Sequence, residues 1–188
     1  MMNVKWTKVV FMLSFLVSSY SFSGPYIGVN LGSTKYEMNH AYKVDNMDKT
    51  YGTSGSYSAV GIKLGYEFNP YLSFEGRYTN NNSLNTYHVP KHQFGLLAKI
   101  SLPVSERVAL YGLAGTSVFD APIYNSSRPS NGTDVFPHTH KVQTTLALGG
   151  GVEFRHSENV AFNMEYVNYA HKDAYKFGGV NIGLNYYF

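Results

Sequence analysis

The chain has 188 residues, enough for one domain, and carries 15 basic and 12 acidic side chains, 17 Tyr, 12 Phe, 18 Gly and no Cys. The lack of cysteine excludes disulfides, thiol chemistry and lipoprotein attachment, and the small net charge gives no indication of a nucleic-acid partner. After the amino-terminal segment, no stretch approaches the roughly 18 consecutive apolar residues of a transmembrane helix, so a membrane-spanning form would have to be a closed β-barrel.

The first 23 residues have the pattern of a secretory signal peptide. Lys5 and Lys8 precede a short apolar core, and Ser21 and Ser23 supply small side chains at −3 and −1 of a cleavage site. The core is too short to span a bilayer as a helix, although an amino-terminal anchor is the alternative interpretation. We therefore expect export, cleavage after Ser23 and a single mature domain over residues 24–188.

The rest of the chain contains eight stretches in which side chains alternate with the period of two that is typical of strands. In chain order the expected strands cover residues 26–36, 58–68, 71–79, 92–102, 108–119, 141–154, 160–169 and 178–188. Most of them have one apolar face and one small or polar face. The stretch 108–119 is ambiguous, because Tyr111 and Leu113 compete with Leu110 and Val118 for the apolar face. We interpret Tyr111 as facing outward.

The last stretch has the clearest pattern. Its apolar face consists of Val180, Ile182, Leu184, Tyr186 and Phe188. An apolar stripe of about ten residues that ends in aromatic residues suits a lipid-facing strand of an outer-membrane barrel, although a half-buried strand of a soluble sheet would also alternate.

The connections between these stretches differ in length in a regular way. Polar segments at 40–56, 80–88 and 120–140 are long and 170–176 is of medium length, whereas the turns at 69–70, 103–107 and 156–159 are short. An up-and-down barrel whose termini are both periplasmic has this asymmetry, with long external loops and tight periplasmic turns. The sequence therefore predicts an all-β fold, an eight-stranded antiparallel up-and-down transmembrane β-barrel.

Charged residues of the expected strands lie opposite the aromatic faces. They are Lys63, Glu67, Glu75, Arg77, Lys99, Glu153 and Glu165, with Lys141 as a further member. Inside a narrow eight-stranded barrel such charges can neutralise one another and fill the interior, so we expect a plugged barrel. A narrow water-lined path, which these charges would gate, is the alternative.

The main rival fold is a soluble up-and-down barrel of lipocalin type, with apolar residues inside. Large rings at the strand ends favour a membrane barrel, because they fit an aromatic belt at the two interfaces. These rings are Tyr66, Phe68, Tyr71, Tyr78, Phe154, Tyr166, Tyr186 and Phe188.

Several motifs resemble the eight-stranded outer-membrane protein A and X family of barrels. They are Tyr-Ile-Gly-Val at 26–29, Gly-Tyr-Glu-Phe-Asn-Pro-Tyr-Leu-Ser-Phe-Glu at 65–75, Tyr-Gly-Leu-Ala-Gly at 111–115 and the terminal strand ending at Phe188. The resemblance implies a Gram-negative outer-membrane protein of the porin family. It also implies that the barrel-assembly machinery recognises the last strand. Two-domain members continue into a peptidoglycan-binding domain, so termination at Phe188 predicts the single-barrel kind.

Histidines near the expected external loops raise the question of a metal site. His138 and His140 are spaced for chelation from one extended segment, with His88 or His92 as further ligands. The more ordinary interpretation is unpaired histidines on a polar rim, and we expect no metal and no cofactor.

Some small outer-membrane barrels modify lipid A as acyltransferases or deacylases, using a histidine that activates a serine or water. The adjacent pair His156 and Ser157 lies in an expected periplasmic turn, where solvated side chains are the simpler interpretation. We therefore expect no catalytic residues. The expected protein is a monomeric, non-enzymatic barrel in contact with outer-membrane lipids. Its role would be envelope structure, surface interaction with an unidentified ligand, or limited solute passage, and lipid A modification is the alternative.

Overall fold

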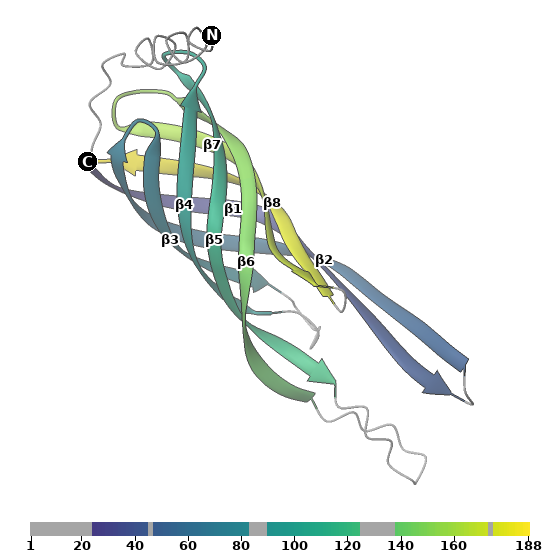
Figure 1. The fold of residues 1–188 in the computed structure, drawn as a ribbon. Coiled ribbons are helices and arrows are strands. Elements are labelled where there is room, and N and C mark those ends of the chain that lie inside the picture. The colour runs from purple at the N-terminus through teal and green to yellow at the C-terminus, as the bar shows by residue number, and fades with distance from the viewer. Residues whose placement is uncertain (1–23, 45–46, 83–89, 125–137, 173–174) are drawn as a thin grey trace, which may run out of the picture.

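The computed structural model describes residues 24–44, 47–82, 90–124, 138–172 and 175–188. They form eight strands in one closed antiparallel sheet (Figure 1). The strands are β1 (Gly24–Val44), β2 (Met47–Asn69), β3 (Leu72–Asn82), β4 (His92–Pro103), β5 (Val108–Tyr124), β6 (His138–Arg155), β7 (Val160–Lys172) and β8 (Tyr175–Tyr187). Among the described residues, no helix is long and apolar enough to cross a membrane.

Each strand pairs with the next, and the pairing of β1 with β8 closes the barrel. All pairs are antiparallel, so the fold is the predicted up-and-down barrel. The carboxyl terminus lies at the end of the barrel with the short turns, opposite the end where the β1–β2 and β5–β6 hairpins project (Figure 1). At the closing seam, the Phe188 amide donates a hydrogen bond of 3.2 Å to the Pro25 carbonyl.

Local polar side chains explain why the short turns are tight. The Asn69 side-chain oxygen accepts hydrogen bonds from the backbone amides of Tyr71 and Leu72, each at 2.9 Å. The Ser105 hydroxyl accepts one from the Val108 amide at 3.1 Å. Asn and Ser favour turns because their side chains replace backbone partners in this way.

Two hairpins extend further than the sequence predicts. The segment 40–56, expected to be a loop, belongs mostly to β1 and β2, whose pairing continues to Val44 opposite Met47. Likewise β5 and β6 take residues from both ends of the expected loop 120–140, and their last pair is Tyr124 with His138. Residues 80–82 of the expected loop 80–88 and most of the expected loop 170–176 also belong to strands. The composition of these segments is typical of loops, but backbone pairing across a hairpin does not require an apolar face.

The two faces of the sheet have the reverse of a soluble protein's polarity. Aliphatic and aromatic side chains such as Ile62, Leu96 and Leu184 point outward and are exposed, whereas charged side chains such as Lys63 and Glu165 are buried inside. Of the predicted aromatic belt, Tyr66, Phe68, Phe154, Tyr166, Tyr186 and Phe188 are exposed on the outside, and Tyr71 and Tyr78 are partly exposed. Exposed apolar surface of this extent is stable only where a non-aqueous medium or a partner covers it.

The predicted facing of β5 is wrong. Tyr111 points into the barrel with 6% of its surface exposed, whereas Leu110 faces outward with 49% exposed. The Tyr111 hydroxyl donates a 2.8 Å hydrogen bond to the Glu165 carboxylate, which faces it from β7. Leu110 has no polar group that needs a partner and therefore suits the outer face.

Candidate functional site inside the barrel

Charged side chains from five strands meet in the barrel interior. The structure places Lys63 and Glu67 on β2, Glu75 and Arg77 on β3, Lys99 on β4, Glu153 on β6 and Glu165 on β7, and all seven are buried. Arg155, the last residue of β6, joins them. Four cationic side chains thus face four carboxylates inside the described part of the barrel.

Arg77 is the centre of the first cluster. Its guanidinium forms an ion pair with Glu75 on the same strand and contacts Glu165, across the barrel, with N–O distances of 2.6 and 3.1 Å. A planar guanidinium can bond two carboxylates at once through separate edges. The arrangement leaves Arg77 and both carboxylates paired despite their burial.

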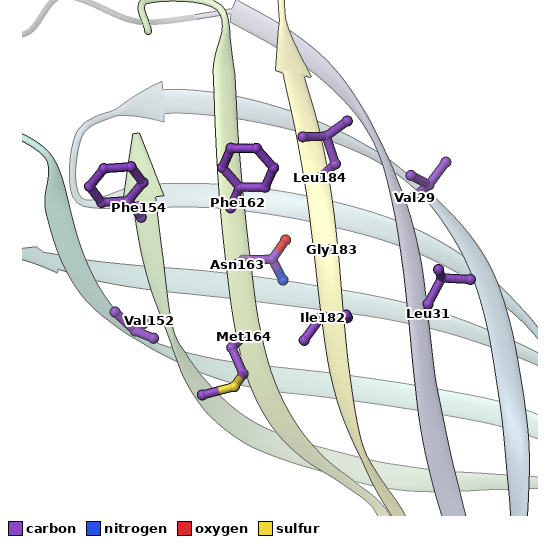
Figure 2. A pocket seen from close by; sticks show the side chains of 10 residues that line it. All are labelled: Val29, Leu31, Val152, Phe154, Phe162, Asn163, Met164, Ile182, Gly183 and Leu184. Atoms are coloured by element: carbon purple, nitrogen blue, oxygen red, sulfur yellow. The ribbon is translucent and has the colours of Figure 1, made fainter. Parts of the chain in front are cut away.

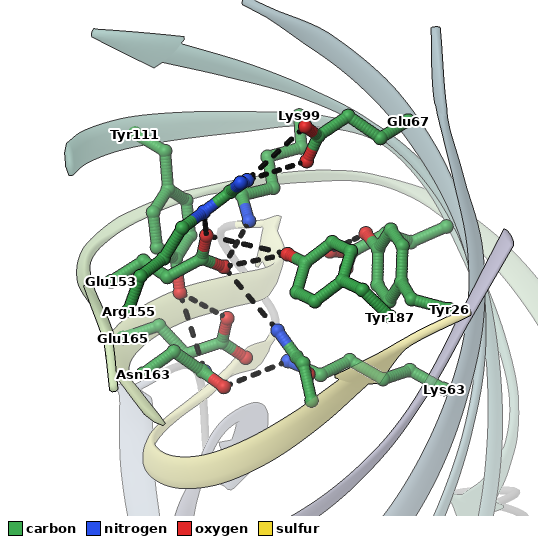
Figure 3. A network of polar contacts seen from close by, with 12 residues as sticks. Tyr26, Lys63, Glu67, Lys99, Tyr111, Glu153, Arg155, Asn163, Glu165 and Tyr187 are labelled. Carbon is green, nitrogen blue, oxygen red and sulfur yellow. Dashed lines mark hydrogen bonds and ion pairs between the residues drawn. The ribbon is translucent and has the colours of Figure 1, made fainter. Parts of the chain in front are cut away.

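The second cluster surrounds Glu153 (Figure 3), which lies two residues before the end of β6 and thus near the short β6–β7 turn. The Lys99 ammonium lies 2.6 Å from one oxygen of Glu153, and the Arg155 Nε lies 3.5 Å from the other. Arg155 also donates two hydrogen bonds to Glu67, at 2.9 and 3.1 Å. Glu67 on β2 and Glu153 on β6 are therefore joined through one guanidinium.

Three tyrosine hydroxyls complete the coordination of these carboxylates. Tyr26 donates to Glu75 at 2.5 Å, Tyr111 to Glu165 at 2.8 Å, and Tyr187 to Glu153 at 3.1 Å. The Tyr26 and Tyr187 rings also pack against each other, with centroids 4.8 Å apart. A buried carboxylate is costly unless its oxygens are bonded, so these tyrosines contribute to keeping the interior charges ionised.

Lys63 is connected to the network through neutral groups. Its ammonium donates to the Asn163 side-chain oxygen at 3.1 Å, and the Asn163 amide donates to the Tyr111 hydroxyl at 3.4 Å (Figure 3). Tyr111 in turn bonds Glu165. The chain Lys63–Asn163–Tyr111–Glu165 thus crosses the interior from β2 to β7.

An apolar cluster fills the interior toward the end with the long hairpins. Phe177 is its centre, with ring centroids 5.4 Å from Phe119, 5.4 Å from Tyr169 and 6.1 Å from Tyr36. All four rings are almost fully buried. We call these four residues the aromatic plug. The interior is therefore filled by charged groups at one end and by rings at the other.

The carboxylates of the interior network are all engaged in ion pairs. Each of the four lies within ion-pair distance of a lysine or an arginine. Within the described ranges, no group of three or more His, Cys, Asp or Glu side chains is placed to hold a metal ion.

Of the histidines singled out from the sequence, His92 and His156 lie within the described part of the structure. His156 and Ser157 are exposed in the β6–β7 turn, where both backbone amides bond the Val160 carbonyl. His92 is exposed on β4, and its Nδ1 lies 2.8 Å from the Tyr78 hydroxyl. His88 and the side chains of His138 and His140 lie outside the described part of the structure, as does the side chain of Lys141.

The residues of the expected assembly signal lie on the outer face of β8 and at Phe188, the residue that follows it. Val180, Ile182, Leu184, Tyr186 and Phe188 are exposed there, and the alternate residues of the strand face the interior.

Sequence reasoning missed Arg155 and the interior tyrosines. Arg155 lies one residue beyond the expected strand 141–154, although its alternation with Glu153 indicates an inward position. Tyr26 and Tyr187 have the inward parity of their strands, but sequence does not show which carboxylates they bond, because Glu75 and Glu153 lie on distant strands.

Comparison with known proteins agrees with the fold. A family model described as "Outer membrane protein beta-barrel domain" matches residues 9–188. Outer membrane protein A of Klebsiella pneumoniae is 26% identical over 147 residues, which cover 75% of this chain and 42% of that protein. Outer membrane protein A of Escherichia fergusonii is also 26% identical over 147 residues, with 40% of its length covered. The chain thus spans less than half the length of these curated relatives.

Solved structures share the architecture at lower sequence identity. Neisserial surface protein A superimposes with a TM-score of 0.58 and 18% identity, over 88% of this chain and 98% of that one. Ail, the attachment invasion locus protein of Yersinia pestis, gives a TM-score of 0.54 and 19% identity, over 88% and 99% of the two chains. The family match extends over nearly the whole chain and agrees with the inverted polarity of the barrel. The chain belongs to the outer membrane protein beta-barrel domain family, and its location is the outer membrane.

Proposed function

We propose that this protein is a non-enzymatic, non-conducting outer-membrane barrel that contributes to envelope structure and presents its long hairpins to the outside. In this proposal residues 1–23 are removed on export, the assembly machinery recognises β8, and the barrel acts as a monomer. The ion network and its eight charged residues serve the stability of the barrel.

The filled interior is the observation that carries the proposal. Solutes crossing the barrel would have to pass the bonded charges around Arg77 and Glu153 and then the aromatic plug around Phe177. Eight strands leave an interior just wide enough for side chains. At the other end, the β1–β2 and β5–β6 hairpins continue beyond the barrel and offer surface for contact.

Planar-bilayer recording tests the proposed lack of conduction. The purified protein, inserted from detergent at high load, is expected to give no steady conductance. The conductance of the unaltered protein is compared with that of a double variant, Phe119→Ala and Phe177→Ala, which lacks two rings of the aromatic plug. Steady ion currents through the unaltered protein would overturn the proposal.

Lipid A mass spectra separate this proposal from the enzymatic alternative. Cells with and without the protein are expected to have the same acyl pattern. A missing or added acyl chain that depends on the protein would favour a lipid A-modifying enzyme instead. Gel mobility with and without boiling shows in each experiment whether the barrel is folded.

A further inference from the structure

The outer face of the barrel is hollowed over part of its surface. A groove of about 420 Å³ runs across β6, β7, β8 and β1 (Figure 2). Its walls are apolar side chains that point away from the barrel, among them Val29, Leu31, Phe162, Met164, Ile182 and Leu184. Asn163 also lines it, but its side chain bonds Lys63 in the interior, so the polar amide faces away from the groove. The groove therefore offers an apolar ligand hydrocarbon contacts only.

A cationic rim lies on the same strands, toward the end with the long hairpins. Lys35 follows Leu31 on the outward face of β1, about 13 Å further along the strand at the usual rise per residue. Lys176, exposed on β8, lies opposite Glu37 in the β1–β8 ladder. Glu37 forms a 2.6 Å ion pair with Lys35, so among the described side chains of this rim two lysines accompany one carboxylate.

A tyrosine hydroxyl joins this rim. Tyr166 is exposed on the outer face of β7, and its hydroxyl lies over Gly178, 3.1 Å from where a β-carbon of that residue would be. Gly178 is the partner of Lys35 in the β1–β8 ladder. Residue 178, being glycine, leaves the space between Lys35 and the Tyr166 hydroxyl open.

We propose that this sector is a binding site for lipid A, with the phosphorylated headgroup on Lys35, Lys176 and Tyr166 and the end of an acyl chain in the part of the groove between β8 and β1, at Ile182 and Leu31. Two lysines and a hydroxyl suit a phosphate at the membrane interface. The inference rests on the proposed orientation, because only the outer leaflet of the outer membrane holds lipid A. Phospholipids of the inner leaflet face the opposite end of the barrel.

Site-specific photo-crosslinking tests the proposal. A benzophenone amino acid replaces Ser33, which is exposed on β1 between the groove and the rim. The control position is Thr116, exposed on the outer face of β5 at the other side of the barrel. The protein is placed in nanodiscs that contain lipid A, phosphatidylglycerol and phosphatidylcholine in equal parts, irradiated, and analysed by mass spectrometry.

Adducts of lipid A are expected to exceed those of phosphatidylglycerol at position 33 and to show no such excess at position 116. The double variant Lys35→Gln and Lys176→Gln is expected to lower lipid A capture at position 33 about tenfold, since each basic residue contributes separately. Lys91→Gln removes an exposed lysine beside β4, away from the groove, and is expected to leave capture unchanged.

Equal capture of both anionic lipids at position 33, or equal lipid A capture at the two positions, would overturn the inference. If either result came from a barrel that is folded and does not conduct, only the lipid A site would be contradicted, and the proposed function would not be affected. Conductance of the unaltered protein would overturn the proposed function whichever lipid is captured. Gel mobility identifies variants that fail to fold.

Discussion

At the scale of single residues, the interior charges depend on one another. Arg77 neutralises two carboxylates, and Glu153 is bonded by Lys99, Arg155 and the Tyr187 hydroxyl. Loss of one partner leaves a buried charge uncompensated, which costs more than the net contribution of the intact pair. Stability is therefore expected to be far more sensitive to single substitutions in this network than to the same substitutions in the turns.

Arg77→Met is expected to lower the free energy of unfolding by about 3–5 kcal/mol, because Glu75 and Glu165 lose their shared cation. Arg107→Met, in an exposed turn, is the matched control and is expected to change it by less than about 0.5 kcal/mol. Urea titration in lipid vesicles, followed by gel mobility, measures both. Equal effects of the two substitutions would contradict a structural role for the network.

Tyr111→Phe tests the inward facing of β5. It removes the hydrogen bond to Glu165 and keeps the ring, with an expected loss of about 1.5–3 kcal/mol because the acceptor is charged. Tyr71→Phe, at a partly exposed turn position, is expected to have little effect. The same urea titration compares the two variants. If Tyr111→Phe were silent, Tyr111 would not contact the network.

At the scale of elements, periodicity predicts most strands but not all of their facings or ends. Residues 178–188 have one apolar and one polar face, and the structure agrees. In 108–119, both faces contain large apolar residues. The inward facing of Tyr111 is set by its hydrogen bond to Glu165, and the sequence of this strand does not show that Glu165 lies across the barrel from it. The tips of the β1–β2 and β5–β6 hairpins are missed because their residues have weak strand propensity, whereas backbone pairing sustains them.

The pairing of β7 with β8 is irregular between Asn168 and Ala170, and a side chain of β6, the strand on the other side of β7, contacts the backbone there. The Thr145 hydroxyl donates a 2.5 Å hydrogen bond to the Tyr169 carbonyl. The backbone pairing of β6 with β7 ends at Leu148 and Asn168, so the Thr145 side chain supplies a donor on the β6 side where the ladder has stopped.

Thr145→Val is expected to lower the free energy of unfolding by about 1–3 kcal/mol, because the buried Tyr169 carbonyl loses its donor. Thr144→Val, on the outward face of the same strand, is the control and is expected to be neutral or slightly stabilising in lipid. Hydrogen exchange of β7 amides and urea titration report on the effect. A destabilisation by Thr144→Val as large as that by Thr145→Val would argue against the role assigned to this contact.

At the scale of the whole molecule, the membrane assignment depends on the inverted polarity of the barrel. Leu96→Lys places a charge on the lipid-facing side and is expected to cost about 2–4 kcal/mol near mid-membrane. Urea titration in lipid vesicles measures this cost. Lys91→Arg is the control. It keeps the charge at an exposed position beside the same strand and is expected to leave the free energy of unfolding unchanged. If Leu96→Lys left the free energy of unfolding unchanged, the outer face at this position would be in contact with water.

Spin labels give an independent measurement of the same polarity. Labels at Ile62, Leu96 and Leu184 are expected to be accessible to oxygen dissolved in the hydrocarbon and protected from water-soluble relaxation agents. Labels at Lys63 and Glu165 should not contact lipid, because both side chains lie inside. The opposite result at the two sets of positions would contradict the membrane assignment.

The sequence separation of the interior ion pairs has a consequence for biogenesis. Arg77 and Glu165 lie 88 residues apart, as do Glu67 and Arg155, and Lys99 lies 54 residues from Glu153. These pairs join β3 with β7, β2 with β6 and β4 with β6, and in none of these pairs are the two strands neighbours in the sheet. A sheet of only the first four or five strands would therefore carry buried charges that have no counterion yet. Stepwise entry of hairpins into lipid would meet this electrostatic penalty at every stage. We expect insertion to be concerted, with the polypeptide nearly complete before it enters the bilayer.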